Sequence, residues 1–246
     1  MNYLNNTITI NLLKLKHCCF IVWLISSFNS AAQQQSPISI QGKLLYAKQA
    51  LKLNQWLYNS PHTDSIMLTS VQFYLSKIEL LNNRKIVWQE PNSYHLLSAD
   101  DSNSLRIQLP TPTNIVFTGI RFHIGIDSAT NYAGAQGGDL DPTKGMYWTW
   151  QNGYINCKLE GKSTQCNTRY NEFTFHIGGY LFPDNALQTV NIPCNNTNTV
   201  DLNIDITKWF DGIDLSKQNH VMSPGQEAVL LANKLVTLFS IPQNEK

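Results

Sequence analysis

The chain has 246 residues, with 18 Lys and Arg, 17 Asp and Glu, and a formal net charge of +1. This length suits one large domain or two small ones. Because the charges nearly cancel and form no basic stripe, the composition argues against nucleic-acid binding, which depends on clustered cations that contact phosphates.

The first 32 residues have the pattern of a secretory signal peptide. Lys14 and Lys16 precede the apolar run 18–28 (CCFIVWLISSF), and the small residues 30–32 follow it. The run is shorter than the roughly 20 apolar residues that span a bilayer. We therefore expect residues 1–32 to be removed and residues 33–246 to form one exported domain without a transmembrane segment, in the periplasm or at the cell surface.

Period-2 alternation, which is typical of β-strands, recurs through the middle of the chain. A hairpin is expected where 77–81 and 85–89 flank the turn signal Asn82-Asn83. Clusters of Gly, Pro, Asn and Asp separate the other predicted strands, which are 66–75, 115–126, 147–159, 172–177, 187–192 and 199–206. Because no helices alternate with them, we expect an all-β fold, an antiparallel β-sandwich of the Ig-like or Greek-key type.

A short helix is expected near the C-terminus. Ser223 would be its N-cap, Pro224 would occupy the first helical position, and Gln226 follows three residues after the cap. Beyond this start, Leu231, Leu235 and Leu238 fall on one helical face. This helix should cover an edge or an open end of the sandwich.

Signal removal leaves three cysteines, namely Cys157, Cys166 and Cys194. In an oxidising compartment we expect a disulfide between Cys157 and Cys166, which flank the turn-like segment KLEGKSTQ. Cys194 would then be buried, pair alternatively with Cys166, or bind a metal.

The histidines are candidate metal ligands, because neutral imidazole commonly binds copper and zinc. In the mature chain none lies within four residues of another, so any metal site must be assembled from separate strands. His123 and His176 fall on the polar sides of their predicted strands. The sequence contains no Gly-x-Ser-x-Gly motif and no recognisable catalytic order of Ser, Asp and His, and we do not expect an enzyme.

A second kind of metal is suggested by Asp127, Asp139 and Asp141, which lie in or beside a Gly-rich loop. Oxygen ligands suit Ca²⁺, but the loop lacks the spacing and the terminal Glu of an EF-hand. An Asp-Pro turn with Gly needs no ion. Calcium is therefore an alternative that the sequence does not require.

Three segments together point to a known family. The stretch 125–161 (GIDSATNYAGAQGGDLDPTKGMYWTWQNGYINCKLEG), with VWQEPNSYHLL before it and FTFHIGGYLF after it, resembles the MbnP family of periplasmic copper-binding proteins, related to MopE and CorA. The resemblance implies binding of Cu(I) or Cu(II) outside the cytoplasm, for copper acquisition or handling. In relatives, two histidines hold copper with a tryptophan that a di-haem peroxidase-like (MbnH-type) partner oxidises to kynurenine.

The resemblance also implies a set of site residues. The modified tryptophan of relatives stands two residues from a ligand histidine, and its counterpart here is Trp88, so Glu90 replaces that histidine. His176 matches the family's strand and is the first expected ligand. His95 would take the missing role, with Trp88 or Glu90 completing the site, and His123 is a further candidate.

The alternative function is a metal-independent, exported β-sandwich module that binds a glycan or a protein. It would display Trp148, Trp150 and Tyr154, because the two tryptophans project to the same side of their predicted strand. These aromatics could equally form a packed row that covers the core, since each buries a large apolar area. Binding that survives chelators would distinguish this module from a copper protein.

Overall fold

The computed structural model describes residues 38–58, 65–151 and 153–242, which belong to one compact unit. The predicted signal peptide, residues 1–32, and the start of the predicted domain lie outside these residues. No helix among the described residues is long and apolar enough to cross a membrane.

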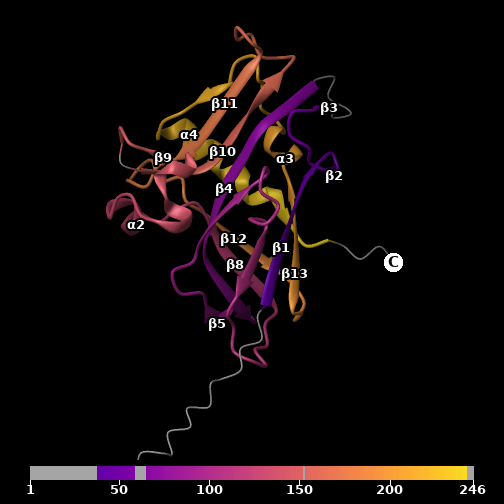
Figure 1. Cartoon of the computed structure of the whole chain (residues 1–246), viewed down its shortest axis with the longest axis vertical. Helices are drawn as coiled ribbons and strands as arrows, with labels where there is room; N and C mark the ends of the chain where they lie inside the picture. Colours follow the sequence, from indigo (N-terminus) through magenta and orange to yellow (C-terminus); the bar gives the residue numbers. More distant parts are fainter. Residues whose placement is uncertain (1–37, 59–64, 152, 243–246) are drawn as a thin grey trace, which may run out of the picture. The chain divides into compact units, whose positions relative to one another are not determined.

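Two sheets make up most of the described chain (Figure 1). The smaller sheet contains β1 (Ile38–Tyr46), β2 (Gln49–Ala50), β7 (Arg106–Leu109), β13 (Thr199–Asp205) and β15 (Phe239–Ser240). The larger sheet contains β3 (Trp56–Tyr58), β4 (Ser65–Asn82), β5 (Lys85–Gln89), β6 (Tyr94–Ser98), β8 (Gly119–Ile124), β9 (Tyr147–Trp148), β10 (Gly153–Ser163), β11 (Glu172–Gly178), β12 (Gln188–Pro193) and β14 (His220–Val221).

Strand β4 organises the larger sheet. On one side its first half pairs with β10 and its second half with β8, as Figure 1 shows. On its other side β3, β6 and β5 follow one another along its length. A sequence of 18 residues that is apolar at most positions can serve this role, because both faces of β4 are covered.

The predicted β-sandwich with a short C-terminal helix is confirmed. One core cluster joins apolar side chains of both sheets, for example Ile40 and Leu202 from the smaller and Phe122 and Leu159 from the larger. Most strand pairs are antiparallel, as expected, but β1 with β13 and β11 with β14 are parallel.

A second cluster lies on the opposite face of the larger sheet. It is formed by Tyr74, Leu96, Ile126, Leu140, Met146, Trp148, Tyr154 and Ile155. The segment that supplies half of these residues contains α2 (Ser128–Tyr132), η2 (Gly138–Leu140) and η3 (Pro142–Lys144). This face of the sheet is therefore covered by a loop, whereas the inner face meets the other sheet.

The remaining helices are α3 (Thr207–Phe210), α4 (Gln226–Leu235) and η4 (Val236–Leu238). The predicted apolar face is correct, because Leu231, Leu235 and Leu238 are all buried in the main core. The predicted cap is wrong: α4 begins after Gly225, and no side chain caps it.

Two details of the predicted strands can be compared with the structure. The hairpin between β4 and β5 is confirmed, and Asn83 and Arg84 occupy its turn with φ of 49° and 67°, as a type I′ turn requires. The predicted strand 147–159 is wrong as a single element, because a turn separates β9 from β10 and the two pair with each other.

The predicted disulfide is absent, and Cys157, Cys166 and Cys194 are free thiols. The segment after Cys157 continues as strand to Ser163 instead of turning. Six residues of strand place Ser163 roughly 20 Å from Cys157, and Cys166 lies in the turn that follows, so the two cysteines are far beyond the Cα distance of about 7 Å that a disulfide tolerates. Burial raises the pKa of the Cys194 thiol to about 11, so this thiol is a poor nucleophile.

Candidate functional site

A carboxylate–histidine pair lies at the edge of the larger sheet. Nε2 of His95 is 2.8 Å from Oε2 of Glu90, whose side chain is buried. The Ser93 hydroxyl donates to the same carboxylate oxygen and accepts a hydrogen bond from the Ile78 amide. The loop between β5 and β6 is thus fixed to β4, and it holds the two functional groups together.

Trp88 belongs to the same edge. It lies opposite Leu80 on β4 and packs, half-buried, against the main core. Two residues later the Glu90 amide donates to the carbonyl of Ile78 at 2.9 Å, which continues the pairing with β4 beyond the end of β5. Since alternate residues of a strand share a face, Trp88 and Glu90 lie on the same side.

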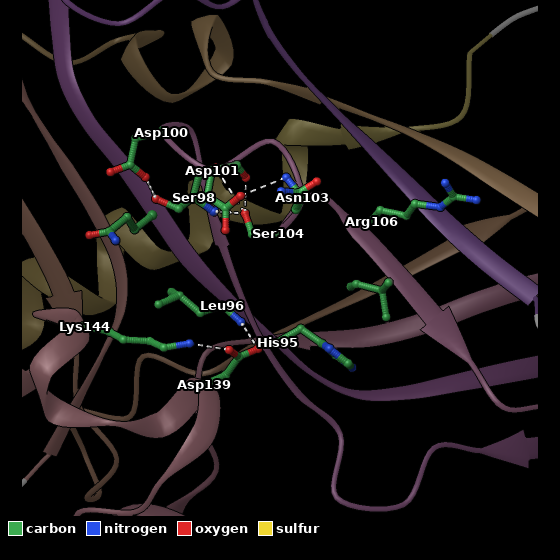
Figure 2. A pocket seen from close by; sticks show the side chains of 12 residues that line it. His95, Leu96, Ser98, Asp100, Asp101, Asn103, Ser104, Arg106, Asp139 and Lys144 are labelled. Atoms are coloured by element: carbon green, nitrogen blue, oxygen red, sulfur yellow. Dashed lines mark hydrogen bonds and ion pairs between the residues drawn. The ribbon is translucent and has the colours of Figure 1, made fainter.

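A cavity of about 510 Å³ opens beside His95 (Figure 2). The ring of His95 points away from the Asp139–Lys144 pair in this view. The side chain of His95 is 23% exposed, compared with 8% for Glu90, so the imidazole is the accessible member of the pair. Most other lining residues are polar, namely Gln72, Ser98, Asp100, Asp101, Asn103, Ser104, Arg106, Asp139 and Lys144.

A second carboxylate–histidine pair lies on β10 and β11. Nε2 of His176 is 2.7 Å from Oε1 of Glu160, and this hydrogen bond is the main reason that the pKa of Glu160 is lowered. The predicted orientation of His176 is confirmed, because its neighbours Phe175 and Ile177 both point into the core. The imidazole therefore faces the outer side of the sheet, where it is nevertheless buried.

The structure does not bring His95 and His176 to one metal ion. Strands β6 and β11 are separated by β4 and β10, so the two positions lie roughly 14 Å apart across the sheet. His95 pairs with the core residue Leu75, whereas His176 faces outward. The two pairs are thus on opposite faces, and each must be considered as a separate site.

His123 stands apart from both pairs. On β8 it lies opposite Ser76, whereas His95 lies opposite Leu75, the preceding residue of β4. Neighbouring residues of a strand point to opposite faces, so His123 and His95 do too. Nδ1 of His123 is buried and has no hydrogen-bond partner among the described residues. Burial, and then the charge of Lys77, lowers the pKa of His123.

The stability of the fold should fall as the pH drops below about 6.5, the ordinary pKa of histidine. Because the pKa of His123 is lower in the folded chain, a falling pH protonates this histidine in the unfolded chain first and so favours unfolding. The loss of stability is complete once the pH lies below the pKa of His123 in the folded chain. His123→Gln should flatten the slope of unfolding free energy between about pH 7 and pH 5, measured in urea. The exposed His220 provides the control, His220→Gln, and an unchanged slope in H123Q would contradict the expectation.

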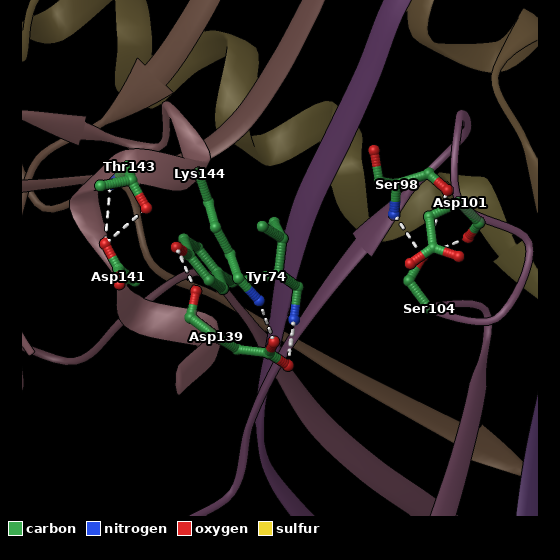
Figure 3. Close-up of polar contacts among 9 residues, drawn as sticks. Tyr74, Ser98, Asp101, Ser104, Asp139, Asp141, Thr143 and Lys144 are labelled. Carbon is green, nitrogen blue, oxygen red and sulfur yellow. Dashed lines mark hydrogen bonds and ion pairs between the residues drawn. The ribbon is translucent and has the colours of Figure 1, made fainter. Parts of the chain in front are cut away.

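The aspartates considered as calcium ligands are engaged in local contacts, as Figure 3 shows for Asp139 and Asp141. Asp141 accepts from the amide and hydroxyl of Thr143 at 2.8 and 2.7 Å, and these bonds lower its pKa. Asp139 contacts Nζ of Lys144 at 2.6 Å and the amide of Leu96 at 3.1 Å. These contacts fasten the covering segment to β6.

Asp127 has a similar structural role. Its side chain caps α2 by accepting from the amide of Thr130 at 2.9 Å. Within the described ranges, no group of three or more His, Cys, Asp and Glu side chains is placed to hold a metal ion. Each carboxylate–histidine pair therefore offers two protein donors, and a third ligand must come from elsewhere.

The exposed aromatic row of the alternative function is not present. Trp148 and Tyr154 are buried, and only Trp150 is exposed, at 65%. The indole of Trp150 packs against that of Trp148 with ring centroids 5.9 Å apart. The turn between β9 and β10 is responsible, because it ends the alternation that would have put both tryptophans on one face.

Two residues that contact these pairs, Glu160 and Ser93, were not predicted from the sequence. Glu160 lies diagonally across from His176 on the neighbouring strand, a relation that depends on the register between β10 and β11. Both residues alternate outward in their strands, which is the available signal. Ser93 follows the turn at Asn92, and nothing in the local pattern indicates its contact with Ile78.

The fold and these pairs define a β-sandwich protein with two carboxylate–histidine pairs on its larger sheet. The family model MbnP matches residues 35–223, and the chain therefore belongs to the MbnP family. Among solved structures, MbnP from Methylosinus trichosporium is similar, with a TM-score of 0.58 and 14% identity over 74% of this chain and 80% of that chain. At this identity the likeness shows the fold alone. A search of the curated proteins found no match.

Proposed function

We propose that this chain is an exported copper-binding protein whose site is formed by His95 and Glu90 beside Trp88. The MbnP family is associated with copper handling in general. Imidazole nitrogen suits copper, and a carboxylate adds an anionic oxygen that favours Cu(II). The proposed role is acquisition or handling of the metal and not catalysis.

The contact between His95 and Glu90 supports this assignment most directly. Nε2 of His95 and Oε2 of Glu90 are 2.8 Å apart, so an imidazole nitrogen and a carboxylate oxygen already lie close enough to bind the same ion. The His176–Glu160 pair has a similar spacing of 2.7 Å. The His95 pair is preferred because His95 lines the cavity and because Glu90 follows Trp88 by two residues on the same side of the sheet.

Trp88 is the proposed source of the third ligand. Two equivalents of peroxide, activated by a di-haem peroxidase-like (MbnH-type) partner and reduced to water, would cleave the indole C2–C3 bond to N-formylkynurenine. Hydrolysis would then release C2 as formate and leave kynurenine. The product exposes an amine and a carbonyl on the same side as Glu90. Because one carbon is exchanged for one oxygen in the residue, the intact mass of the natively produced protein reports whether the reaction has occurred.

Copper binding can be tested by competition titration of the natively produced protein with Cu(I) and Cu(II). We expect stoichiometric binding, a loss of affinity of at least about 100-fold in His95→Ala, and about 10- to 100-fold in Glu90→Gln. His220→Ala serves as the control, because this histidine is exposed and lies on β14, which β11, β10 and β4 separate from the strand of His95.

The result for His176→Ala locates the site. Unchanged binding in H176A with loss in H95A supports the proposal. Loss in H176A alone would move the site to the His176–Glu160 pair. The absence of copper binding in the natively produced protein without any substitution would refute the function.

A further inference from the structure

Three tyrosines surround a second cavity, of about 560 Å³, on the loop-covered side of the larger sheet. Tyr132 ends α2, Tyr147 belongs to β9, and Tyr180 follows β11. Thr149 and the backbone around Gly134 complete the lining. The volume falls in the range of about 300–1,000 Å³ that is typical of small-molecule sites.

The walls of this cavity are held in place before any ligand arrives. The Ser128 hydroxyl donates to the carbonyl of Tyr180 at 2.7 Å, which ties the loop after β11 to α2. The ring of Tyr180 lies on Gly153, where even a Cβ would come within 3.1 Å of it. Asn131 accepts from the amide of Tyr154 at 2.7 Å, which fixes α2 to β10. A ligand would therefore meet a preformed shape.

The lining has a definite chemistry. No lining side chain is charged. Within the described part of the chain, no hydrogen-bond partner is present for the hydroxyls of Tyr132, Tyr147 and Tyr180. The cavity thus presents apolar ring faces together with free phenol groups that can donate and accept. An ion would find no counter-charge, and a purely apolar ligand would leave phenols that it buries unpaired.

We propose that this tyrosine cavity binds a neutral saccharide unit. A pyranose ring presents an apolar face of C–H groups, which can lie on an aromatic ring, and an equatorial rim of hydroxyls, which can pair with phenols. Tyr132 is 82% exposed and so offers a ring face that a sugar would cover. The site is distinct from the His95–Glu90 pair and does not depend on copper.

Calorimetric titration with three neutral probes, chitotriose, maltotriose and cellotriose, tests the inference. At least one should bind, and Tyr132→Ala should weaken its binding by about tenfold. Tyr180→Phe, which keeps the ring and removes the hydroxyl, should weaken it by about fivefold. Tyr170→Ala is the matched control, because Tyr170 is also exposed but lies beyond the other end of β10, roughly 30 Å away.

Two further measurements test whether binding needs copper and whether it discriminates against a charged saccharide. Binding should persist in a chelator and in His95→Ala, so failure of the copper site leaves this result intact. Binding of a trigalacturonate as tight as that of the neutral probes, no binding of any neutral probe, or equal affinities in Tyr132→Ala and Tyr170→Ala would each overturn the proposal.

Discussion

Replacing Arg121 with alanine is expected to lower the free energy of unfolding by about 3–5 kcal/mol. Arg121 on β8 lies opposite Glu79 on β4, and its Nε donates to the Glu79 carboxylate. The Glu79 side chain is only 2% exposed, so removal of the guanidinium leaves a buried negative charge without a cation. Urea unfolding at neutral pH, followed by tryptophan fluorescence, measures the loss.

Two further variants separate this effect from the loss of packing. Replacing both residues with leucine should recover most of the stability, because a buried ion pair can be exchanged for apolar side chains at little cost. Lys162→Ala removes a solvent-exposed cross-strand pair with Glu172 and should cost less than about 1 kcal/mol. Equal losses in Arg121→Ala and Lys162→Ala would show that burial of Glu79 is not decisive.

Gly161→Ala is the second substitution with a large expected effect, a loss of about 3 kcal/mol in unfolding free energy. Gly161 lies on β10 where its register with β4 shifts. An added Cβ would stand 2.3 Å from the carbonyl oxygen of Met67 and 2.6 Å from the ring of Phe173. The first contact is with backbone, so strand β4 itself would have to move away from β10.

Gly137→Ala is the matched control for this overpacking. No atom lies within 4 Å of a Cβ at Gly137, and its φ of −95° suits any residue. The midpoint temperature of thermal unfolding should therefore be nearly unchanged in G137A and clearly lowered in G161A. Similar midpoint temperatures for the two variants would mean that β4 can move away from β10 at little cost in stability, which would contradict the expectation.

The fold could be predicted where the alternation of apolar residues is unbroken. The hairpin between β4 and β5 and the strands around His123 and His176 follow that pattern, although the turn lies at Asn83-Arg84, one residue later than the expected Asn82-Asn83. Strand β1 was not predicted, because its apolar run is interrupted at Gln41 and Gly42 and its partner β13 is remote in sequence. Alternation reports which residues share a face, but it contains no information about which strands pair.

The candidate site shows the same limit. Glu90 and His95 are five residues apart, and the turn between them brings their side chains together. His176 was expected beside His95, yet its distance depends on two intervening strands that local sequence does not reveal. The proposed disulfide was wrong for a related reason, since the segment after Cys157 has turn-like residues but is held as strand between β4 and β11.

The parallel pairing of β1 with β13 has a consequence for how the chain acquires its structure. Ser39 pairs with Thr199, so the smaller sheet cannot be completed until most of the polypeptide is available, although β1 can pair with β2 and β7 earlier. Contacts between such remote segments carry a large loop-closure entropy and slow the folding rate. A chain that is still being synthesised would hold β1, β2 and β7 without β13 and β15, and early termination before residue 199 would leave part of the inner face of the larger sheet uncovered.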